Sequence, residues 1–342
     1  MPDPSVNRRI VLAQRPQAVA TVADFRLERI AVPNAGPGEM LLRTLWLSLD
    51  PYMRGRMSDA PSYAAPVPVG GVMTAGTVAR GEASEHPEVA GGDLVLSTSG
   101  WQDYAVSDGA GVVKLPPTMP RPSLALGVLG MPGFTAYMGL LDIGKPKAGE
   151  TVVVAAATGA VGSVVGQIAK LHGCHVVGIA GGAEKCAWAV TELGFDACID
   201  HHATDFAAEL AAACPKGIDV YFENVGGKVM RAVLPLLNGH ARVPLCGLIA
   251  QYQGDTGTGG KDFSAQLLRT ILVKRVTVRG FIIFDDYGSR FGEFREQMSA
   301  WLQADKIKYR EDVVAGLERA PEAFLGLMTG QNFGKLVVKV SA

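Results

Sequence analysis

The sequence predicts an α/β protein in which a doubly wound parallel sheet is joined to a second, β-rich domain. Between residues 151 and 283, apolar runs typical of buried strands alternate with segments typical of helices. The first 120 residues instead contain short apolar runs separated by proline and glycine, a pattern that favours an all-β region. A length of 342 residues with 48% hydrophobic side chains is enough to fill two cores.

The segment from residue 151 to residue 170 predicts a dinucleotide site. It begins with an apolar run, Thr151 to Ala157, as a strand covered on both faces requires. Ala157, Gly159 and Gly162 then occupy the three positions of the G-x-G-x-x-G fingerprint, where the backbone approaches a pyrophosphate at the start of a helix. A tight turn whose glycines serve only packing is the alternative. The expected cofactor contacts are Gly159, Ala160, Val161 and Gly162.

Five further strand-like runs follow the fingerprint, and helical segments separate them. The runs span residues 175–182, 197–201, 218–227, 242–250 and 276–283, and the third of these includes the loop at the carboxyl end of its strand. Ligands of such sheets bind outside the carboxyl ends of the strands. We therefore expect the residues that follow these strands to converge at one edge of the sheet.

The β-rich region is expected to include both ends of the chain. Its apolar runs lie at residues 39–50, 71–80 and 91–108, and a further strand is expected at residues 334–340. That last strand has no remaining position in the parallel sheet, so we expect it to return to the first domain. The predicted division is a β-rich domain of residues 1–125 and 306–342, interrupted by a Rossmann domain of residues 126–305.

The composition gives no sign of nucleic-acid or membrane binding. The net charge is −1, and no apolar run reaches the roughly 18 residues of a membrane span. Residues 1–9 are polar, so no signal peptide is expected. The five cysteines are odd in number and have no close pairs, which predicts reduced thiols and a cytoplasmic protein.

Several motifs together resemble one family over nearly the whole chain. They are SLDPYMRGRM at residues 48–57, GMPGFTAYMGL at 130–140, the fingerprint, ENVGG at 223–227 and NFGKLVVKV at 332–340. This set resembles the zinc-independent medium-chain dehydrogenases/reductases, in the branch of prostaglandin reductase, leukotriene B4 12-hydroxydehydrogenase and the double-bond (curcumin-type) reductases. The resemblance implies a Rossmann domain with a GroES-like catalytic domain, a homodimer, and reduction of the C=C bond of α,β-unsaturated ketones or aldehydes.

Zinc-dependent enzymes share this architecture, so the ligands decide the metal question. Catalytic zinc needs about three Cys, His or carboxylate ligands, and a structural zinc needs about four ligands. The chain has no cysteine before residue 172 and one histidine, His86, in a polar loop. The pair His201 and His202 has no metal-ligand spacing to a third residue. We predict no metal.

The end of the second strand predicts the cofactor. NAD enzymes place an acidic residue about 20 residues beyond the fingerprint to hold the ribose 2′-hydroxyl. Here Gly181 and Gly182 leave room for a 2′-phosphate, and Lys185 follows within one turn. In the family the matching lysine binds this phosphate, whereas a tyrosine commonly occupies the position of His201. An imidazole can also donate to a phosphate, and a role unrelated to it remains open. We expect NADPH.

The resemblance implies further cofactor contacts. Asn224 matches a cofactor-binding asparagine, although a capping role in a turn remains the alternative. We interpret Cys246 as a packed thiol and not as a nucleophile. The remaining contacts implied by the resemblance are Gly247, Tyr252, Phe281, Ile282, Ile283 and Asn332.

The implied reaction is hydride transfer from NADPH to the β-carbon of an enone, followed by protonation of the enolate. Tyr252 is the candidate donor to the enolate oxygen, with a loop or core tyrosine as the alternative. Tyr52, Met131 and Thr135 are expected to bind substrate, with Tyr137 beside them. Arg54 and Arg56 either attract an acidic substrate or form ordinary ion pairs.

Two other functions stay open from the sequence. A related branch reduces quinones with the same cofactor, and other relatives bind NADPH without clear turnover. NADPH oxidation assayed with an enone and with a quinone would separate the first alternative. Failure of every electrophile to consume NADPH would favour the second.

Overall fold

The computed structural model describes residues 5–254 and 262–341. These residues divide into two compact units. Unit 1 contains residues 1–127, 311–332 and 336–342, and unit 2 contains residues 128–310 and 333–335. No helix within the described residues is long and apolar enough to cross a membrane.

Unit 2 is built on a parallel sheet that comprises six strands within the described residues. Their order across the sheet is β10, β9, β8, β11, β12 and β13, so the earliest strand lies in the middle and the chain winds outward in both directions. The predicted fold class is confirmed. The strands are β8 (Thr151–Ala155), β9 (His175–Ala180), β10 (Ala197–Asp200), β11 (Ile218–Phe222), β12 (Leu237–Leu245) and β13 (Thr277–Gly280).

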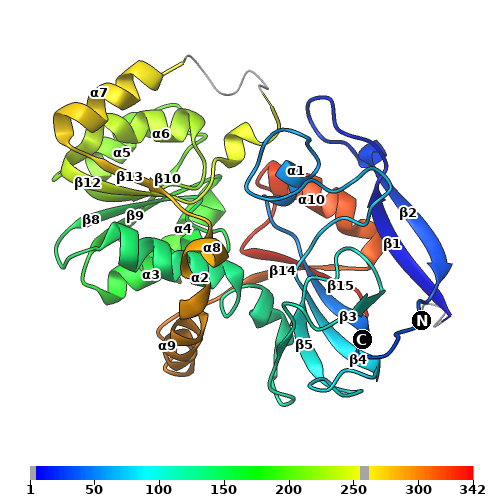
Figure 1. Ribbon diagram of the computed structural model, residues 1–342. Helices are drawn as coiled ribbons and strands as arrows, with labels where there is room; N and C mark the ends of the chain where they lie inside the picture. Colours follow the sequence, from blue (N-terminus) through cyan, green and yellow to red (C-terminus); the bar gives the residue numbers. More distant parts are fainter. Residues whose placement is uncertain (1–4, 255–261, 342) are drawn as a thin grey trace. The chain divides into compact units, whose positions relative to one another are not determined.

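Helices cover both faces of this sheet (Figure 1). α5, α6 and α7 lie on one face, where Leu210, Val229 and Val233 pack against Val153 and Tyr221 of the strands. α2 and α3 cover the opposite face. The helices of unit 2 are α2 (Met131–Met138), α3 (Gly162–Leu171), α4 (Ala183–Thr191), α5 (Phe206–Ala213), α6 (Gly227–Val233), α7 (Ser264–Lys274), α8 (Ile283–Tyr287) and α9 (Phe291–Gln303).

The six predicted strands are all present along the chain, but several of their ends differ. The run at 242–250 belongs to a strand that begins earlier, at Leu237, because this buried residue already pairs with Ile218. The run at 276–283 ends as a strand at Gly280, and Ile283 begins helix α8. Apolar residues after a strand end can pack in a loop or helix, so hydrophobicity alone places the end too late.

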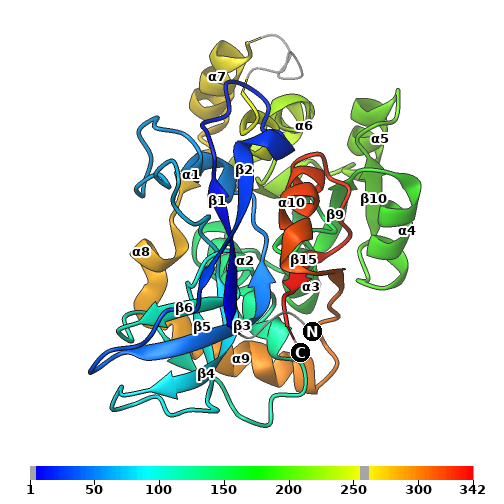
Figure 2. The same ribbon diagram turned by 90° about the vertical axis from the view of Figure 1, so that its right-hand side faces the viewer.

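Unit 1 is rich in antiparallel strands, which Figure 2 shows with the paired ribbon of β1 (Val6–Leu12) and β2 (Phe25–Ala31). Its larger sheet has the order β14, β15, β3, β4, β5 and β7, and β6 pairs with β3. These strands are β3 (Met40–Ser48), β4 (Thr77–Ser84), β5 (Leu94–Ser97), β6 (Tyr104–Ser107), β7 (Val113–Lys114), β14 (Glu311–Ala315) and β15 (Lys335–Lys339).

The C-terminal strand β15 pairs antiparallel with β3, so a strand from the end of the chain completes a sheet formed near its beginning. Two short helices, α1 (Met53–Arg56) and α10 (Ala320–Met328), accompany these strands. The rings of Phe25 and Trp101 stack with centroids 5.5 Å apart, and Phe324 of α10 meets both edge-on. This aromatic cluster joins the N-terminal ribbon to the C-terminal helix.

Candidate functional site

The turn between β8 and α3 is formed by close backbone contacts. A Cβ added at Gly162 would lie 2.2 Å from the carbonyl oxygen of Ala156, so no other residue fits without movement of the backbone. Ala156 itself has φ 52°, which is unusual for a residue with a side chain. Gly159 is less constrained, because its added Cβ would meet the same oxygen at 3.2 Å.

The start of α3 therefore lies directly behind the end of β8. Ala160 and Val161 complete the turn, and both are half-buried. Such a turn presents backbone N–H groups at the positive end of a helix. It can hold the pyrophosphate of a dinucleotide.

A second segment of unit 2 lies beside this turn. Gly334 forms a parallel bridge with Gly159. The neighbouring Phe333 packs its ring edge-on against Trp188 of α4 at 5.1 Å, and the Arg310 guanidinium lies 3.7 Å from the centre of the Phe333 ring. Asn332 directly precedes Phe333 and Gly334 in the sequence.

The residues that follow β9 and β10 form a cluster around Gly181, which we call the basic cluster. It contains His201, His202 and Lys228, with Lys185 near it in the sequence. A Cβ at Gly181 would lie 3.1 Å from His201 Nε2 and 3.1 Å from His202 Cε1. Burial first, and then the neighbouring His202 and Lys228, lower the pKa of His201 to about 4. His201 Nδ1 is buried and has no hydrogen-bond partner among the described residues. Lys185 lies at the start of α4, half-buried.

Asp200 is a part of this cluster that the sequence analysis did not identify. Its Oδ1 accepts hydrogen bonds from the amides of Gly182 and His202, both at 2.9 Å. These bonds hold the pKa of Asp200 below its usual range. An acid is therefore present beside the end of β9, but it comes from β10 and is engaged by two backbone amides.

The loop after β11 is organised by Glu223, which is fully buried. Its Oε1 accepts hydrogen bonds from the amides of Val225 at 2.6 Å and Gly226 at 2.9 Å, and its Oε2 accepts one from the Tyr221 hydroxyl at 2.9 Å. Burial raises the pKa of this carboxyl although these hydrogen bonds act in the opposite direction. Glu223 is thus a positioning residue for the ENVGG loop, and the sequence analysis assigned it no role.

Asn224 and Cys246 join three strand ends. Asn224 Nδ2 donates to the carbonyl of Ala155 at 2.8 Å, which ties the loop after β11 to the end of β8. The Cys246 amide donates to the carbonyl of Glu223 at 2.9 Å, which ties β12 to the same loop. Burial, with a smaller contribution from the Glu223 carboxylate, raises the pKa of Cys246 to about 12. Its thiol stays protonated near neutral pH and is a poor nucleophile.

Tyr252 lies in the segment that follows Cys246 and Gly247. Its hydroxyl accepts a hydrogen bond from the Leu248 amide at 3.2 Å, and a Cβ at Gly247 would lie 3.2 Å from the same oxygen. Gly247 therefore leaves the space that the Tyr252 hydroxyl occupies. A hydroxyl that accepts from an amide can also act as a donor, and accepting polarises its O–H bond.

The segment after β13 is mostly packed. Phe281 is 9% exposed, and its ring lies against Gly139, where an added Cβ would meet it at 2.8 Å. Ile282 is half-buried and precedes α8, which begins at Ile283. This segment contributes apolar surface and no charged group to its surroundings.

In α2, the two predicted substrate residues lie one turn apart. Met131 and Thr135 are both half-buried, and the Thr135 hydroxyl donates to the Met131 carbonyl at 2.8 Å. Tyr137 points elsewhere, since its ring packs near Phe294 and Trp301 of α9. We assign Tyr137 to helix packing and not to the substrate wall.

Tyr52 belongs to unit 1, at the start of α1. Burial raises the pKa of its hydroxyl, and the nearby Asp50 acts in the same direction. Arg54 and Arg56 are both buried, and they donate to the carbonyls of Ala18 at 2.6 Å and Ala64 at 2.7 Å. Both arginines therefore help to fold the loops of unit 1.

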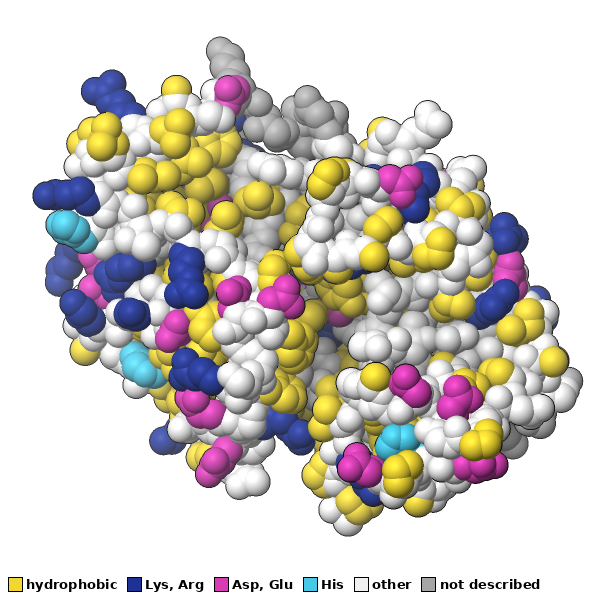
Figure 3. Space-filling view, in the orientation of Figure 1, with side chains coloured by type: hydrophobic (Ala, Val, Ile, Leu, Met, Phe, Trp, Pro, Cys, Tyr) yellow, Lys and Arg dark blue, Asp and Glu magenta, His cyan; other side chains and the backbone are white. Residues whose placement is uncertain are grey.

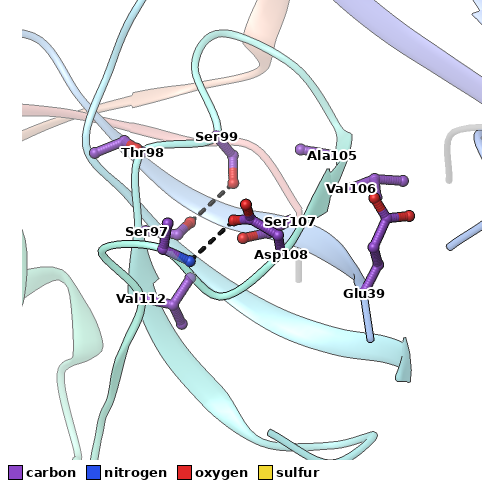
Figure 4. A pocket seen from close by; sticks show the side chains of 10 residues that line it. Glu39, Ser97, Thr98, Ser99, Ala105, Val106, Ser107, Asp108 and Val112 are labelled. Atoms are coloured by element: carbon purple, nitrogen blue, oxygen red, sulfur yellow. Dashed lines mark hydrogen bonds between the residues drawn. The ribbon is translucent and has the colours of Figure 1, made fainter. Parts of the chain in front are cut away.

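A separate hollow of about 400 Å³ lies in unit 1 (Figure 4). The Ser97 and Ser99 hydroxyls bond to each other at 2.8 Å, and the Asp108 carboxylate accepts the Ala110 amide at 3.0 Å. None of the predicted site residues lines it. Among residues 5–254 and 262–341, no three His, Cys, Asp or Glu side chains gather in a way that could hold a metal ion.

Comparison with known proteins places this geometry in a family. Residues 8–115 match a family model described as the N-terminal domain of oxidoreductase, and residues 160–304 match one described as zinc-binding dehydrogenase. An NADPH-dependent curcumin reductase of Escherichia coli is 60% identical over 98% of this chain and 97% of its own length. The chain belongs to the medium-chain dehydrogenase/reductase family.

Two further relatives fix the branch of the family. Prostaglandin reductase 1 of Bos taurus is 40% identical over 93% of this chain and 94% of its own length. The crystal structure of CurA in complex with NADPH from Vibrio vulnificus matches with a TM-score of 0.94 and 60% identity, covering 98% of this chain and 99% of that one. The resemblance to the prostaglandin and curcumin reductase branch is confirmed.

Proposed function

We propose that this chain uses NADPH to reduce the C=C bond of α,β-unsaturated ketones and aldehydes. The observation that carries the proposal is the 60% identity, over nearly the full length of both chains, to an NADPH-dependent curcumin reductase. Curcumin is itself a conjugated enone, and the same bond type defines the substrate class proposed here.

The residues at the edge of the parallel sheet fit such a cofactor. Gly159 and Gly162 leave the backbone of the β8–α3 turn bare, and Ala160 and Val161 present amides at the helix start. The pyrophosphate would be held here by backbone N–H groups. Unit 2 is accordingly proposed as the NADPH-binding domain, and unit 1 as the GroES-like catalytic domain.

The basic cluster around Gly181 suits the 2′-phosphate of the adenosine ribose. Lys185 supplies a cation, and His201 offers the buried Nδ1 that has no protein partner among the described residues. The phosphate would add negative charge beside His201, His202 and Lys228, where the Asp200 carboxylate is already held by two backbone amides. We propose Lys185 and His201 as the residues that select NADPH over NADH.

The nicotinamide half is proposed to lie along the ends of β11, β12 and β13. Asn224 and the Cys246–Gly247 backbone are tied together there by the hydrogen bonds that Glu223 organises. The apolar run after β13 shields the reactive end from water. The proposed contacts in this half are Asn224, Cys246, Gly247, Tyr252, Phe281, Ile282, Ile283 and Asn332.

The bound cofactor supplies the hydride, and this chain must stabilise the charge that develops on the carbonyl oxygen of the substrate. We propose that Tyr252 donates its hydroxyl proton in a hydrogen bond to that oxygen. The amide of Leu248 fixes the Tyr252 hydroxyl in place at 3.2 Å. Tyr52, Met131 and Thr135 are proposed to bind the substrate. No Lewis acid is needed, because addition to the β-carbon leaves a conjugated enolate.

The test is NADPH consumption with a simple enone and identification of the product. The expected product is the saturated ketone with its carbonyl intact, seen by mass and NMR spectroscopy. An allylic alcohol would contradict the proposal, and consumption with quinones alone would assign the chain to quinone reduction.

Tyr252→Phe is expected to lower kcat by about ten- to a hundredfold, because one oxyanion donor is lost. Unchanged turnover in that variant would remove the role of Tyr252.

We also propose that the chain forms a homodimer through α7 and β13. Leu268, Leu272 and Val273 of α7 are 66%, 78% and 65% exposed, and hydrophobic side chains gather over this helix in Figure 3. β13 ends the order of strands in the parallel sheet, so its outer edge can pair with a second copy. Leu272→Glu should give monomers by light scattering, whereas Val19→Glu, at another exposed site, should not. A monomeric unmodified chain would contradict this proposal.

A charge of −1 gives no reason to expect nucleic acid. All five cysteines are free thiols in the structure, which supports a cytoplasmic location.

A further inference from the structure

Two of the five cysteines lie against each other beside the basic cluster. Cys186 is on α4 and Cys198 is on β10, and their side chains share a hydrogen bond. Cys198 is in register with Gly178 of β9, and a Cβ at Gly178 would lie 2.9 Å from Cys198 Sγ. Gly178 therefore leaves the space that this sulfur occupies.

We propose that Cys186 and Cys198 form a reversible disulfide within one chain, and that this disulfide weakens the binding of NADPH. The sulfur pair joins α4 to β10, and Lys185 precedes Cys186 directly. His201 follows Cys198 by three residues. Drawing the two sulfurs from hydrogen-bonding distance to bonding distance therefore moves both elements that carry the proposed phosphate contacts.

The chemistry of the pair differs from that of the other thiols. The hydrogen bond from Cys198 lowers the pKa of Cys186, while the same bond raises the pKa of Cys198. Burial raises the pKa of Cys174 and of Cys214 to about 11. Only a thiolate attacks efficiently, so Cys186 is the expected nucleophile of the pair.

Hydrogen peroxide is the oxidant that the proposal requires. The Cys186 thiolate attacks one peroxide oxygen, the S–O bond forms, the O–O bond breaks, and the departing hydroxide takes up a proton. The Cys198 thiol then loses its proton and attacks the Cys186 sulfur, so that the S–S bond forms and the S–O bond breaks. The two sulfurs lose two electrons in total, and the peroxide is reduced to two waters.

Peptide mapping tests the disulfide independently of the proposed function. Lys185 and Lys216 bound a stretch without Lys or Arg that contains three cysteines. Cleavage after Lys, Arg and Glu separates these cysteines into the peptides 186–192, 193–209 and 210–216. After peroxide treatment of the whole protein and blocking of free thiols, we expect the first two peptides to be joined. Dithiothreitol should release them.

Three variants control the mapping. Cys214→Ser removes the neighbouring buried thiol and should leave the joined peptides unchanged. Cys186→Ser and Cys198→Ser should each abolish them, and Cys198→Ala serves if a serine variant does not fold. The proposal is overturned if peroxide joins other cysteines, joins separate chains, or leaves peptides 186–192 and 193–209 unlinked.

The effect on cofactor binding rests on the proposed function and has its own readout. Coupling between two sites commonly changes affinity about 5–150-fold, and we expect the disulfide to weaken NADPH binding about fivefold, measured by cofactor fluorescence. NADH binding should change less, since it has no 2′-phosphate. Because coupling is reciprocal, saturating NADPH should disfavour the disulfide by the same factor in a glutathione redox buffer. A disulfide with unchanged NADPH affinity would overturn the coupling but leave the proposed activity untouched.

Discussion

The turn after β8 and the loop after β11 lie at the same edge of the parallel sheet, yet they are held in opposite ways. The first depends on the absence of a side chain, because a Cβ at Gly162 would lie only 2.2 Å from the carbonyl oxygen of Ala156. The second depends on a buried carboxylate, because Glu223 receives three hydrogen bonds. The contrast shows that a loop can be fixed either by close contact or by satisfying its polar groups.

The largest effect should follow from removing the carboxylate. Glu223→Ala leaves the amides of Val225 and Gly226 and the buried Tyr221 hydroxyl without their acceptor, and each buried group left in this way costs about 1–3 kcal/mol. We expect the free energy of unfolding to fall by about 3 kcal/mol or more, measured in urea. A loss below about 1 kcal/mol would show that the loop does not depend on Glu223.

Glu223→Gln is the matched control and also isolates a pH effect. Its amide oxygen can still accept from Val225 and Gly226, so the loss of stability should be small. In the unmodified chain, the pKa of Glu223 is higher when folded than when unfolded. The unfolded chain therefore releases this proton first, and the contribution of Glu223 to stability falls as the pH rises from the ordinary carboxyl range through the folded pKa. The Gln variant should lack this decline.

The turn after β8 should respond less strongly in stability. Gly162→Ala places a Cβ against the backbone of Ala156, and overpacking of this kind costs about 1–3 kcal/mol. NADPH affinity should fall as well, since the helix start must move. In Gly159→Ala the nearest atom, the Ala156 oxygen, is 3.2 Å away, so the loss of stability should be smaller and the main loss should appear in cofactor binding. Equal destabilisation by both changes would contradict the separate roles of the two glycines.

The same contrast explains what the sequence could predict. The glycine turn follows from a local pattern, an apolar strand followed by spaced glycines, so the fold class and the strands along the chain are predictable. Glu223 was present in the ENVGG motif, but its role depends on Tyr221 and on complete burial, which no local pattern reveals. Asp200 likewise reaches Gly182 from a neighbouring strand. Hydrogen bonds of this kind form only when the strands assemble into the sheet, so the sequence alone does not predict them.

Near the end of β9, a charged side chain is proposed to hold the cofactor, where the other two loops depend on packing and buried hydrogen bonds. Smaller effects are expected here. Lys185→Ala removes one charge-assisted bond to the proposed 2′-phosphate, worth roughly 1.5–3 kcal/mol. The preference for NADPH over NADH should fall at least about tenfold, with NADH affinity nearly unchanged. Lys170→Ala provides the control, because that lysine pairs with Asp196 at the end of α3, at 2.8 Å. Equal affinity of the unmodified chain for both cofactors would defeat this assignment.

His201 should give the smallest effect, and its sign depends on pH. Without cofactor its pKa is about 4, lowered by burial and by the positive charges of His202 and Lys228, while Asp200 acts in the opposite direction. A bound phosphate dianion stabilises the imidazolium, so the pKa of His201 is higher in the complex. The complex therefore binds more protons, and NADPH affinity should rise as the pH falls through the higher value and level off below about 4.

Protonation of the phosphate itself acts in the other direction, so the readout is the difference between the unmodified chain and His201→Gln. We expect that difference to grow about two- to fivefold from pH 8 to pH 5, since each unit of pKa shift is worth tenfold in affinity at most. NADH should show no such difference, because it lacks the phosphate. If His201→Gln leaves the pH profile for NADPH unchanged, the imidazole does not contact the phosphate, and charge alone from Lys185 selects the cofactor at this strand end.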